Sequence, residues 1–214
     1  LTATAVDING TVAISGDTTF ETGADIITAS AGNNNTRIGV NAGFSIASGG
    51  NGNTCLGEES GRSLTTGDNN VAIGYEALYS ENAHGQNIAI GYRSLKALDA
   101  GAEGNNTGIG YLAGQAITTG TLNTLMGAAA GDGIVTGTRN TALGFNTLGG
   151  AVDDGNYNTC IGSDAGLITT GSQNTFVGAY DPSSGGSGEA MTTGDKNTIL
   201  GAFNGNQNSL DIRT

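Results

Sequence analysis

The segment Asn70-Val71-Ala72-Ile73-Gly74 and its near copy Asn87-Ile88-Ala89-Ile90-Gly91 decide the fold of this chain. Each consists of Asn, a β-branched residue, one further residue, a large apolar residue and Gly. The steps between successive copies are 18, 17, 17, 19, 17, 17, 18, 16 and 23 residues, and such a period predicts a repeat architecture. The ten copies begin at Asn35, Asn53, Asn70, Asn87, Asn106, Asn123, Asn140, Asn158, Asn174 and Asn197.

The second half of each repeat favours strands and corners over helices. Three residues after the Gly stands a small residue, often followed by another Gly, and several repeats end in a Thr-Thr-Gly corner such as 118–120. Seventeen residues are too few for a helix pair, and each Gly inside a helix costs about 1 kcal/mol. The pattern therefore predicts an all-β fold, a β-solenoid (parallel β-roll) of about ten 17-residue coils over residues 33–203. Coils would stack about 4.8 Å apart, with the Asn residues in a ladder.

The two ends of the chain differ from the repeats. Residues 6–12 alternate apolar and polar side chains around an Asn-Gly pair, which is a hairpin signal. We expect residues 1–32 to form an N-terminal β cap or the end of a shaft module, and residues 204–214 to be an irregular C-terminal end. The chain starts at Leu1 without a signal-peptide pattern, so we expect a fragment or a processed product.

Strand parity gives a prediction about oligomerisation. The second and fourth motif residues, such as Val71 with Ile73, share one face, which we assign to the coil interior. The third residue then points outward, yet it is apolar in eight of the ten copies. A strand that is apolar on both sides is covered on both sides, so a homo-oligomer, preferably a trimer, is predicted, the alternative being an insertion that folds back over this face. The predicted interface is Cys55, Ala72, Ala89, Leu125, Ala142, Cys160, Phe176 and Ile199.

The composition limits the classes of molecule that the protein is expected to bind. Seven basic and 19 acidic residues give a net charge of −12, which disfavours nucleic acid and anionic lipid as partners. No stretch approaches the roughly 18 apolar residues of a membrane span, so membrane insertion is not expected.

Candidate chemistry is sparse, and we predict no catalytic, cofactor-binding or metal site. His84 is the one histidine and lies in a polar corner, where a solvated role is the simpler interpretation. The pairs Glu58-Glu59 and Asp153-Asp154 point apart if they lie on strands, although carboxylates from different coils leave an inverting glycosidase open. The segment 49–56 resembles a calcium-binding β-roll motif but has Thr54 where the motif needs Asp.

The two cysteines occupy the same motif position six coils apart. Cys55 and Cys160 would lie about 29 Å from each other at solenoid spacing, well beyond the reach of a disulfide. We expect buried free thiols that act as small apolar side chains.

Two surface features suggest binding. Tyr75, Tyr92 and Tyr111 follow the anchor Gly in three consecutive coils and would form a platform for sugar rings, or else a ladder that packs on its own corners. The longest step contains residues 180–189, a Gly- and Ser-rich run with the single proline of the chain. It is either a binding loop or a plain tolerated insertion, and its candidate contacts are Asp181, Pro182, Ser183 and Glu189.

The unit from Asn106 to Gly114 resembles the head repeat of trimeric autotransporter adhesins and the repeats of bacteriophage tail-fibre proteins. The resemblance covers about residues 33–203 and implies a trimeric β-roll, on a virion surface or extracellular, that attaches to a cell-surface glycan or protein receptor. The autotransporter repeat is usually shorter, and neither its coiled-coil stalk nor its membrane anchor is present here. The 7–12 segment resembles tail-fibre shaft sequence, which favours the phage interpretation.

Three functions therefore stay open, all non-catalytic. The first is a rigid attachment rod, either a tail fibre or an adhesin head. The second is a subunit of a self-assembling extracellular filament. The third is an ice-binding solenoid, which needs Thr rows that point to water, whereas the most regular Thr position is assigned inward here. An enzyme is a distant fourth.

Overall fold

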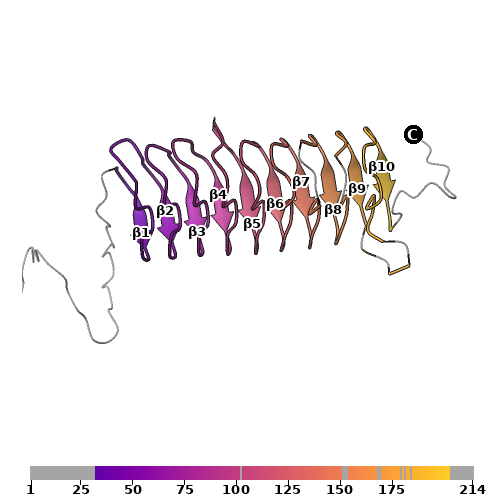
Figure 1. Ribbon diagram of the computed structural model, residues 1–214, viewed down its shortest axis with the longest axis horizontal. Coiled ribbons are helices and arrows are strands. Elements are labelled where there is room, and N and C mark those ends of the chain that lie inside the picture. Colours follow the sequence, from indigo (N-terminus) through magenta and orange to yellow (C-terminus); the bar gives the residue numbers. More distant parts are fainter. Residues whose placement is uncertain are drawn as a thin grey trace, which may run out of the picture.

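The chain folds into a β-solenoid. The computed structural model describes residues 32–202 apart from 102, 151–153, 168–169, 179, 181 and 184. Figure 1 shows successive coils stacked along a rod with one short strand in each. The strands are β1 (Thr36–Ile38), β2 (Thr54–Leu56), β3 (Val71–Ile73), β4 (Ile88–Ile90), β5 (Thr107–Ile109), β6 (Thr124–Met126), β7 (Thr141–Leu143), β8 (Thr159–Ile161), β9 (Thr175–Val177) and β10 (Thr198–Leu200).

All ten strands form one parallel sheet in chain order, so the all-β solenoid prediction is confirmed. Equivalent motif positions pair with one another, as Leu125 does with Ala142. The predicted cap, residues 1–32, lies outside the described residues except for Gly32, and the predicted irregular end, 204–214, lies wholly outside them. The described part of the chain contains no helix with the length and hydropathy of a membrane span.

The anchor asparagines form a buried ladder that ties each coil to the next. The Oδ1 atom of Asn123 accepts a hydrogen bond from the backbone N–H of Asn140 at 2.9 Å. Its Nδ2 donates to the Gly137 carbonyl oxygen at 2.9 Å and to Asn106 Oδ1 at 3.1 Å. Asn123 is fully buried. Every Asn side chain of this kind satisfies backbone groups that a buried corner would otherwise leave unpaired, which costs about 1–3 kcal/mol for each group.

The glycine that ends each strand allows backbone to pass over backbone. Gly127 has φ +136°. A Cβ atom there would overlap the carbonyl oxygen of Gly144 in the next coil and come within 2.7 Å of its carbonyl carbon. Gly is therefore needed at this corner both for its φ and for the close approach of the coils.

The assignment of the two strand faces from the sequence is wrong. In β2 to β10 the third motif residue is the buried one, whereas the second and fourth are exposed or half-buried. Each three-residue strand thus directs one side chain inward and two outward. The predicted oligomer interface is consequently the core of a single chain: Cys55, Ala72, Ala89, Leu125, Ala142, Cys160 and Phe176 are all 0% exposed, and Ile199 is 4% exposed.

Side-chain size inside the coil is complementary between two motif positions. Where the third residue is Ala, the residue six places later is a fully buried Leu. Where the third residue is larger, that place is Gly, and a Cβ on Gly131 would meet Leu125 Cδ2 at 2.7 Å. The Ala–Leu pairs are Ala72 with Leu78, Ala89 with Leu95 and Ala142 with Leu148, and the larger–Gly pairs are Arg37 with Gly43, Cys55 with Gly61, Leu125 with Gly131 and Cys160 with Gly166. In the coil with the insertion, Gly188 takes this place against Phe176, twelve residues later.

Candidate functional site

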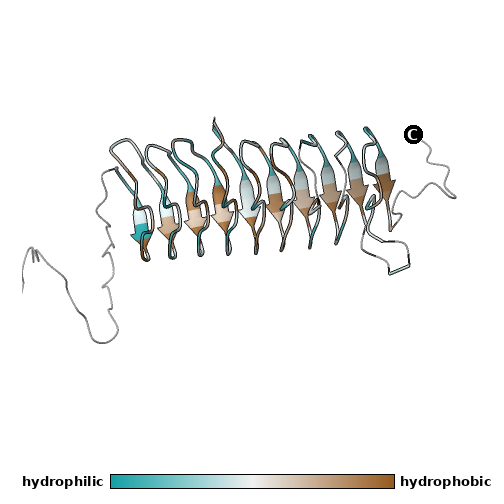
Figure 2. Cartoon of the chain, in the orientation of Figure 1, coloured by the Kyte–Doolittle hydropathy of each residue, from teal (hydrophilic) through white to brown (hydrophobic). Residues whose placement is uncertain are grey.

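The outward strand positions form two continuous rows along the rod. Because the strands pair in register, Thr124 stands above Thr141 and Met126 above Leu143. The strands are brown toward their arrowheads in Figure 2, where the apolar row runs. The apolar row is Ile38, Leu56, Ile73, Ile90, Ile109, Met126, Leu143, Ile161, Val177 and Leu200. The second row, which we call the Thr row, runs parallel to it and consists of Thr36, Thr54, Val71, Ile88, Thr107, Thr124, Thr141, Thr159, Thr175 and Thr198.

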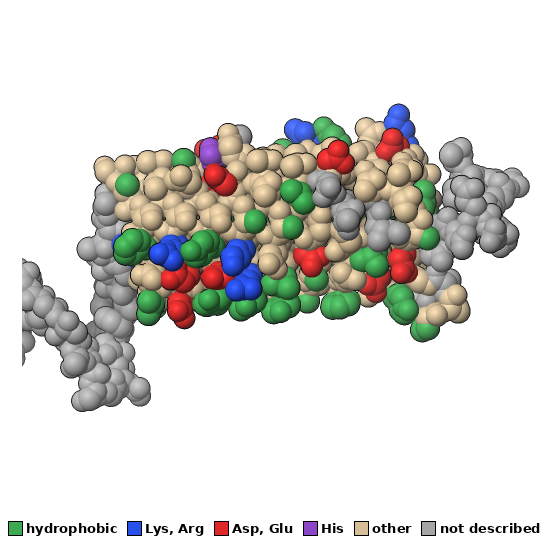
Figure 3. Space-filling model, viewed as in Figure 1, with side chains coloured by type: hydrophobic (Ala, Val, Ile, Leu, Met, Phe, Trp, Pro, Cys, Tyr) green, Lys and Arg blue, Asp and Glu red, His purple; other side chains and the backbone are tan. Residues whose placement is uncertain are grey.

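The apolar row is exposed or half-buried along its whole length in the single chain. Leu143 is 44% exposed, Leu56 is 41% exposed and Leu200 is 75% exposed. Green side chains gather along the lower edge of the rod in Figure 3, on the side toward which the strands of Figure 1 point. At about 4.8 Å for each step, the row runs for about 43 Å along the rod. An uninterrupted apolar stripe of this length is unusual on a monomeric surface and marks an interaction site.

The three tyrosines form a stacked ladder. Ring centroids are 5.5 Å apart between Tyr75 and Tyr92 and 5.3 Å apart between Tyr92 and Tyr111. Both faces of Tyr92 are therefore covered by its neighbours. The ladder offers ring edges, hydroxyls and the outer ring faces of its two ends, of which Tyr111 is the more exposed at 56%. That leaves less aromatic surface for sugar rings than three separate platforms would offer.

Charged groups border the tyrosine ladder. The Arg93 guanidinium lies 5.0 Å from the centroid of the Tyr92 ring. Glu76 forms two ion pairs: its Oε2 atom lies 2.7 Å from Arg93 Nε and 2.7 Å from Lys96 Nζ. Partial burial works against ionisation of Glu76, but the hydrogen bonds from Lys96 and Arg93 prevail and lower its pKa. The nearby Glu76 charge raises the pKa of the Tyr75 hydroxyl. The ladder thus presents aromatic edges next to paired charges.

The candidate binding loop divides into two parts. Pro182 and Ser183 are exposed, and Asp181 lies outside the described residues. Glu189 accepts a 2.6 Å hydrogen bond from the backbone N–H of Gly186. Ser187 and Gly188 occupy the small–Gly position of this coil, because Gly166 N–H donates to the Ser187 carbonyl. Glu189 therefore belongs to the coil itself and supports its corner.

The cysteines are buried free thiols, as the sequence predicts. Burial raises the pKa of Cys55 to about 11, against a smaller opposing effect of Arg37, and raises that of Cys160 to about 12. Thiolate is the reactive form of cysteine. Both groups are therefore protonated and shielded at neutral pH.

We expect the native protein to resist a thiol reagent such as Ellman's reagent at pH 8, with both thiols reacting at once in denaturant. At three or more pH units below the pKa, only about one thiol in a thousand is ionised. Because these pKa values are raised on folding, the stabilising contribution of the two thiols is complete below their ordinary value of 9.0 and is lost as the pH rises through about 11–12. Rapid labelling of either cysteine in the folded chain would contradict this burial.

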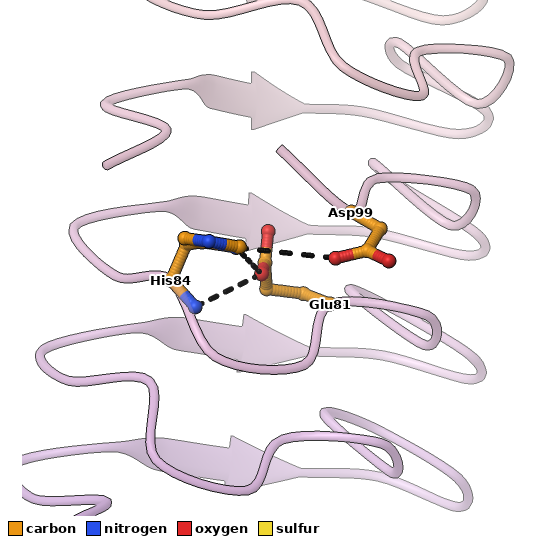
Figure 4. Close-up of side chains that lie close together, drawn as sticks. All are labelled: Glu81, His84 and Asp99. Carbon is orange, nitrogen blue, oxygen red and sulfur yellow. Dashed lines mark hydrogen bonds and ion pairs between the residues drawn. The ribbon is translucent and has the colours of Figure 1, made fainter. Parts of the chain in front are cut away.

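A cluster of ionisable groups lies at another corner, where His84 meets carboxylates from two coils (Figure 4). His84 Nδ1 is 3.1 Å from Glu81 Oε1 and 3.9 Å from Asp99 Oδ1. The Glu81 side chain is fully buried, whereas those of His84 and Asp99 are 26% and 59% exposed. Burial raises the pKa of Glu81, and hydrogen bonds from His84 and Ala100 oppose that rise.

Backbone groups hold the Glu81 carboxylate in place. Its Oε1 atom accepts hydrogen bonds from the backbone N–H groups of Asn82 at 3.0 Å and His84 at 3.2 Å. Its Oε2 atom accepts one from Ala100 N–H at 3.3 Å. The carboxylate therefore bridges its own corner and the next coil. The interpretation of His84 as a simple solvated corner residue misses this neighbourhood.

The pattern of the repeat contained a signal for Glu81 that sequence reasoning did not use. Eleven residues after the anchor Asn, the other early coils have an aliphatic core residue, and all of those residues are buried. Glu81 stands at that position in its coil. Ionisable side chains are almost never fully buried unless paired, so this exception indicates a local purpose. The aliphatic equivalents are Ile46, Leu64, Leu98, Ile117 and Ile134.

Of the two carboxylate pairs singled out from the sequence, the structure describes Glu58, Glu59 and Asp154. Glu58 is exposed, whereas Glu59 pairs with Arg62 at 2.9 Å and accepts a hydrogen bond from Asn41 at 2.8 Å. Asp154 is exposed, and Asp153 lies outside the described residues. Glu59 therefore links coils. Thr54, at the position where a calcium β-roll has Asp, lies on the outer Thr row.

Comparison with known proteins yields no match to a family model, to a curated protein or to a solved structure.

Proposed function

We propose that this chain is a structural subunit of a non-catalytic, homotrimeric attachment rod of the tail-fibre or adhesin-head kind, displayed on a virion surface or outside a cell. The observation that carries the proposal is the continuous apolar row on the outer face of β1 to β10. This row takes the place of the interface expected from the sequence, because the residues of that expected interface are buried in the core of a single chain. The partner is a second and a third copy of this chain.

The pattern of the outer face favours self-association. Each strand contributes one large apolar side chain and one Thr, Val or Ile to a straight ribbon parallel to the rod axis. Burial of apolar surface contributes about 25 cal/mol for each Å². Copies that pack side by side along the whole row would bury it over about 43 Å.

A narrow stripe suits a three-fold axis better than a two-fold contact between sheets. The ribbon is two side chains wide, and a face-to-face dimer of sheets would need a broader apolar surface. Three copies around one axis can each direct the apolar row toward the centre. The resemblance of the 106–114 unit to trimeric adhesin and tail-fibre repeats supports the same number of copies.

We expect the chain in solution to have a mass of about 63 kDa, three times the 21.1 kDa of one chain, by light scattering. The double variant Leu56→Asp/Leu143→Asp should dissociate it to monomers, because two charges on the apolar row would be buried in every interface. Both residues are exposed in the single chain, so the coil itself should still fold. Thr193→Asp, at an exposed corner, is the matched control and should remain trimeric. A monomeric wild-type chain would overturn the proposal.

Attachment is proposed through exposed residues that are not members of the apolar row. Tyr111, with its open ring face, and the exposed Pro182 and Ser183 are the candidate contacts for a cell-surface glycan or protein receptor. A glycan array probed with the same trimeric sample tests the glycan class. Loss of array binding in Tyr111→Ala, with the trimer intact, is the expected result. Electron microscopy of isolated short rods would count against the filament alternative.

One observation favours an ice-binding function as a second candidate. The Thr row points outward, so the objection drawn from an inward Thr position no longer holds. The two functions need the same face and are mutually exclusive for it. Normal ice growth in the presence of the protein would remove this candidate, and a monomer that arrests ice growth would favour it over the trimer.

A further inference from the structure

We propose that Glu81, His84 and Asp99 form a binding site for a divalent transition-metal ion of the zinc class. The three side chains offer two carboxylate oxygens and one imidazole nitrogen, and these ligand atoms all lie within 4.8 Å of one another. Imidazole and carboxylate are the nitrogen and oxygen ligands that Zn²⁺ prefers. The site lies within one chain and does not depend on the attachment role.

The spacing of the donors suits a small tetrahedral ion. Bonds of about 2.0–2.1 Å to such an ion place neighbouring ligand atoms about 3.3 Å apart. His84 Nδ1 and Glu81 Oε1 are already 3.1 Å apart, and Asp99 Oδ1 lies 3.9 Å from the same nitrogen. The exposed Asp99 side chain would have to turn toward the other two ligand atoms, since all three lie within 4.8 Å of one another. The metal would take the place of the direct contact between Nδ1 and Glu81 Oε1.

The carboxylate of Glu81 is pre-oriented for this role. Its three backbone hydrogen bonds, from Asn82, His84 and Ala100, fix both oxygens from two coils. Such supporting hydrogen bonds orient metal ligands and are a regular part of metal sites. His84 and Asp99 reach it from its own corner and from the next coil, as Figure 4 shows.

The charge balance of the cluster also favours a dication. Within the described residues, the ion pairs of Glu81 and Asp99 are made with His84 alone. With a neutral imidazole the cluster carries two negative charges, one of them buried in a position that neighbouring coils fill with Leu or Ile. A divalent ion neutralises both. The exposed sides of His84 and Asp99 leave a fourth position for water, and the ion would clamp one coil to the next.

Tag-free protein and zinc chloride test the proposal, because the chain has a single histidine. Calorimetry should show one zinc ion bound for each chain, with magnesium chloride giving no comparable binding. In ¹⁵N nuclear magnetic resonance, zinc should shift the Nδ1 signal of the one imidazole. A zinc-dependent rise in the unfolding temperature should accompany both.

Two variants separate the site from non-specific binding to an acidic protein. Glu81→Leu restores the aliphatic residue of neighbouring coils and should fold, yet lose zinc affinity at least about tenfold, as should Asp99→Asn. Asp154→Asn, at an exposed carboxylate elsewhere, is the control and should bind zinc as the wild type does. Equal affinity in Glu81→Leu, an unshifted imidazole signal, or no saturable zinc binding would each overturn the proposal.

Discussion

Replacing Gly127 with Ala is expected to destabilise the rod by at least about 4 kcal/mol, the size of effect reserved for severe steric conflicts. The φ of +136° alone costs an L-residue about 1–3 kcal/mol. The larger part comes from the added methyl group, which would overlap the Gly144 carbonyl. The overlap falls on the backbone of the next coil, which cannot move without opening hydrogen bonds between coils. Urea denaturation of the purified protein measures the loss.

Gly49→Ala is the matched control for this substitution. Gly49 has a similar φ of +116°, but the nearest atom to its added Cβ, on Thr66, is at an ordinary 3.4 Å. The Gly49→Ala variant should lose only the stability that an L-residue at positive φ costs. If Gly127→Ala and Gly49→Ala lose the same stability, the close approach of successive coils is not what requires glycine at the strand ends.

The architecture was predictable from the sequence because a regular repeat with this period indicates a stacked fold. Ten Asn-x-x-x-Gly units at a 17-residue period require equivalent residues to stack, and the structure places every unit on one strand of one parallel sheet. The Asn ladder follows from the same period. The buried free thiols also follow, since Cys55 and Cys160 lie at one motif position in coils too far apart to pair.

The direction of the strand faces was not predictable from parity alone. Parity states that positions two and four share a face, but not which face is the interior. Hydrophobicity misled the assignment, because the fourth position is uniformly large and apolar while the third contains Ala72, Ala89 and Gly108. The interior of a 17-residue coil is narrow, so a large inward side chain at one position, such as Leu125, is matched by Gly at another, and the uniformly large fourth position remains outside.

The cluster around His84 was missed for a similar reason. His84 and Glu81 are three residues apart, but Asp99 reaches them only because the coils stack. A single coil read by itself shows one histidine and one carboxylate, but not the second carboxylate that completes the cluster. Alignment of the repeats shows that Glu81 stands at a position where the neighbouring coils have Leu or Ile. This is the part of the site that could have been found from the sequence.

The size complementarity inside the coil gives the second large effect. Leu125→Ala should cost about 3 kcal/mol, because a fully buried side chain is lost and a cavity remains. Gly131→Leu should cost a similar amount, since its Cβ alone would lie 2.7 Å from Leu125 Cδ2 and its φ is +64°. The two substitutions together recreate the arrangement of Ala142 and Leu148, a buried Ala followed by a buried Leu at φ +50°.

The double variant Leu125→Ala/Gly131→Leu should therefore be more stable than either single variant, with a coupling of about 3 kcal/mol in a double-mutant cycle. The remaining loss is the strain of Leu at positive φ, a conformation that Leu78, Leu95 and Leu148 already adopt in the native chain. Leu125→Ala/Gly114→Leu is the control with the same composition. Gly114 lies in the preceding coil, where Leu95 Cδ2 would also stand 2.7 Å from the new Cβ, so this pair should rescue less. Additive losses in the first pair would show that the third position is not matched to the ninth, and that the inward direction of the third residue has some other cause.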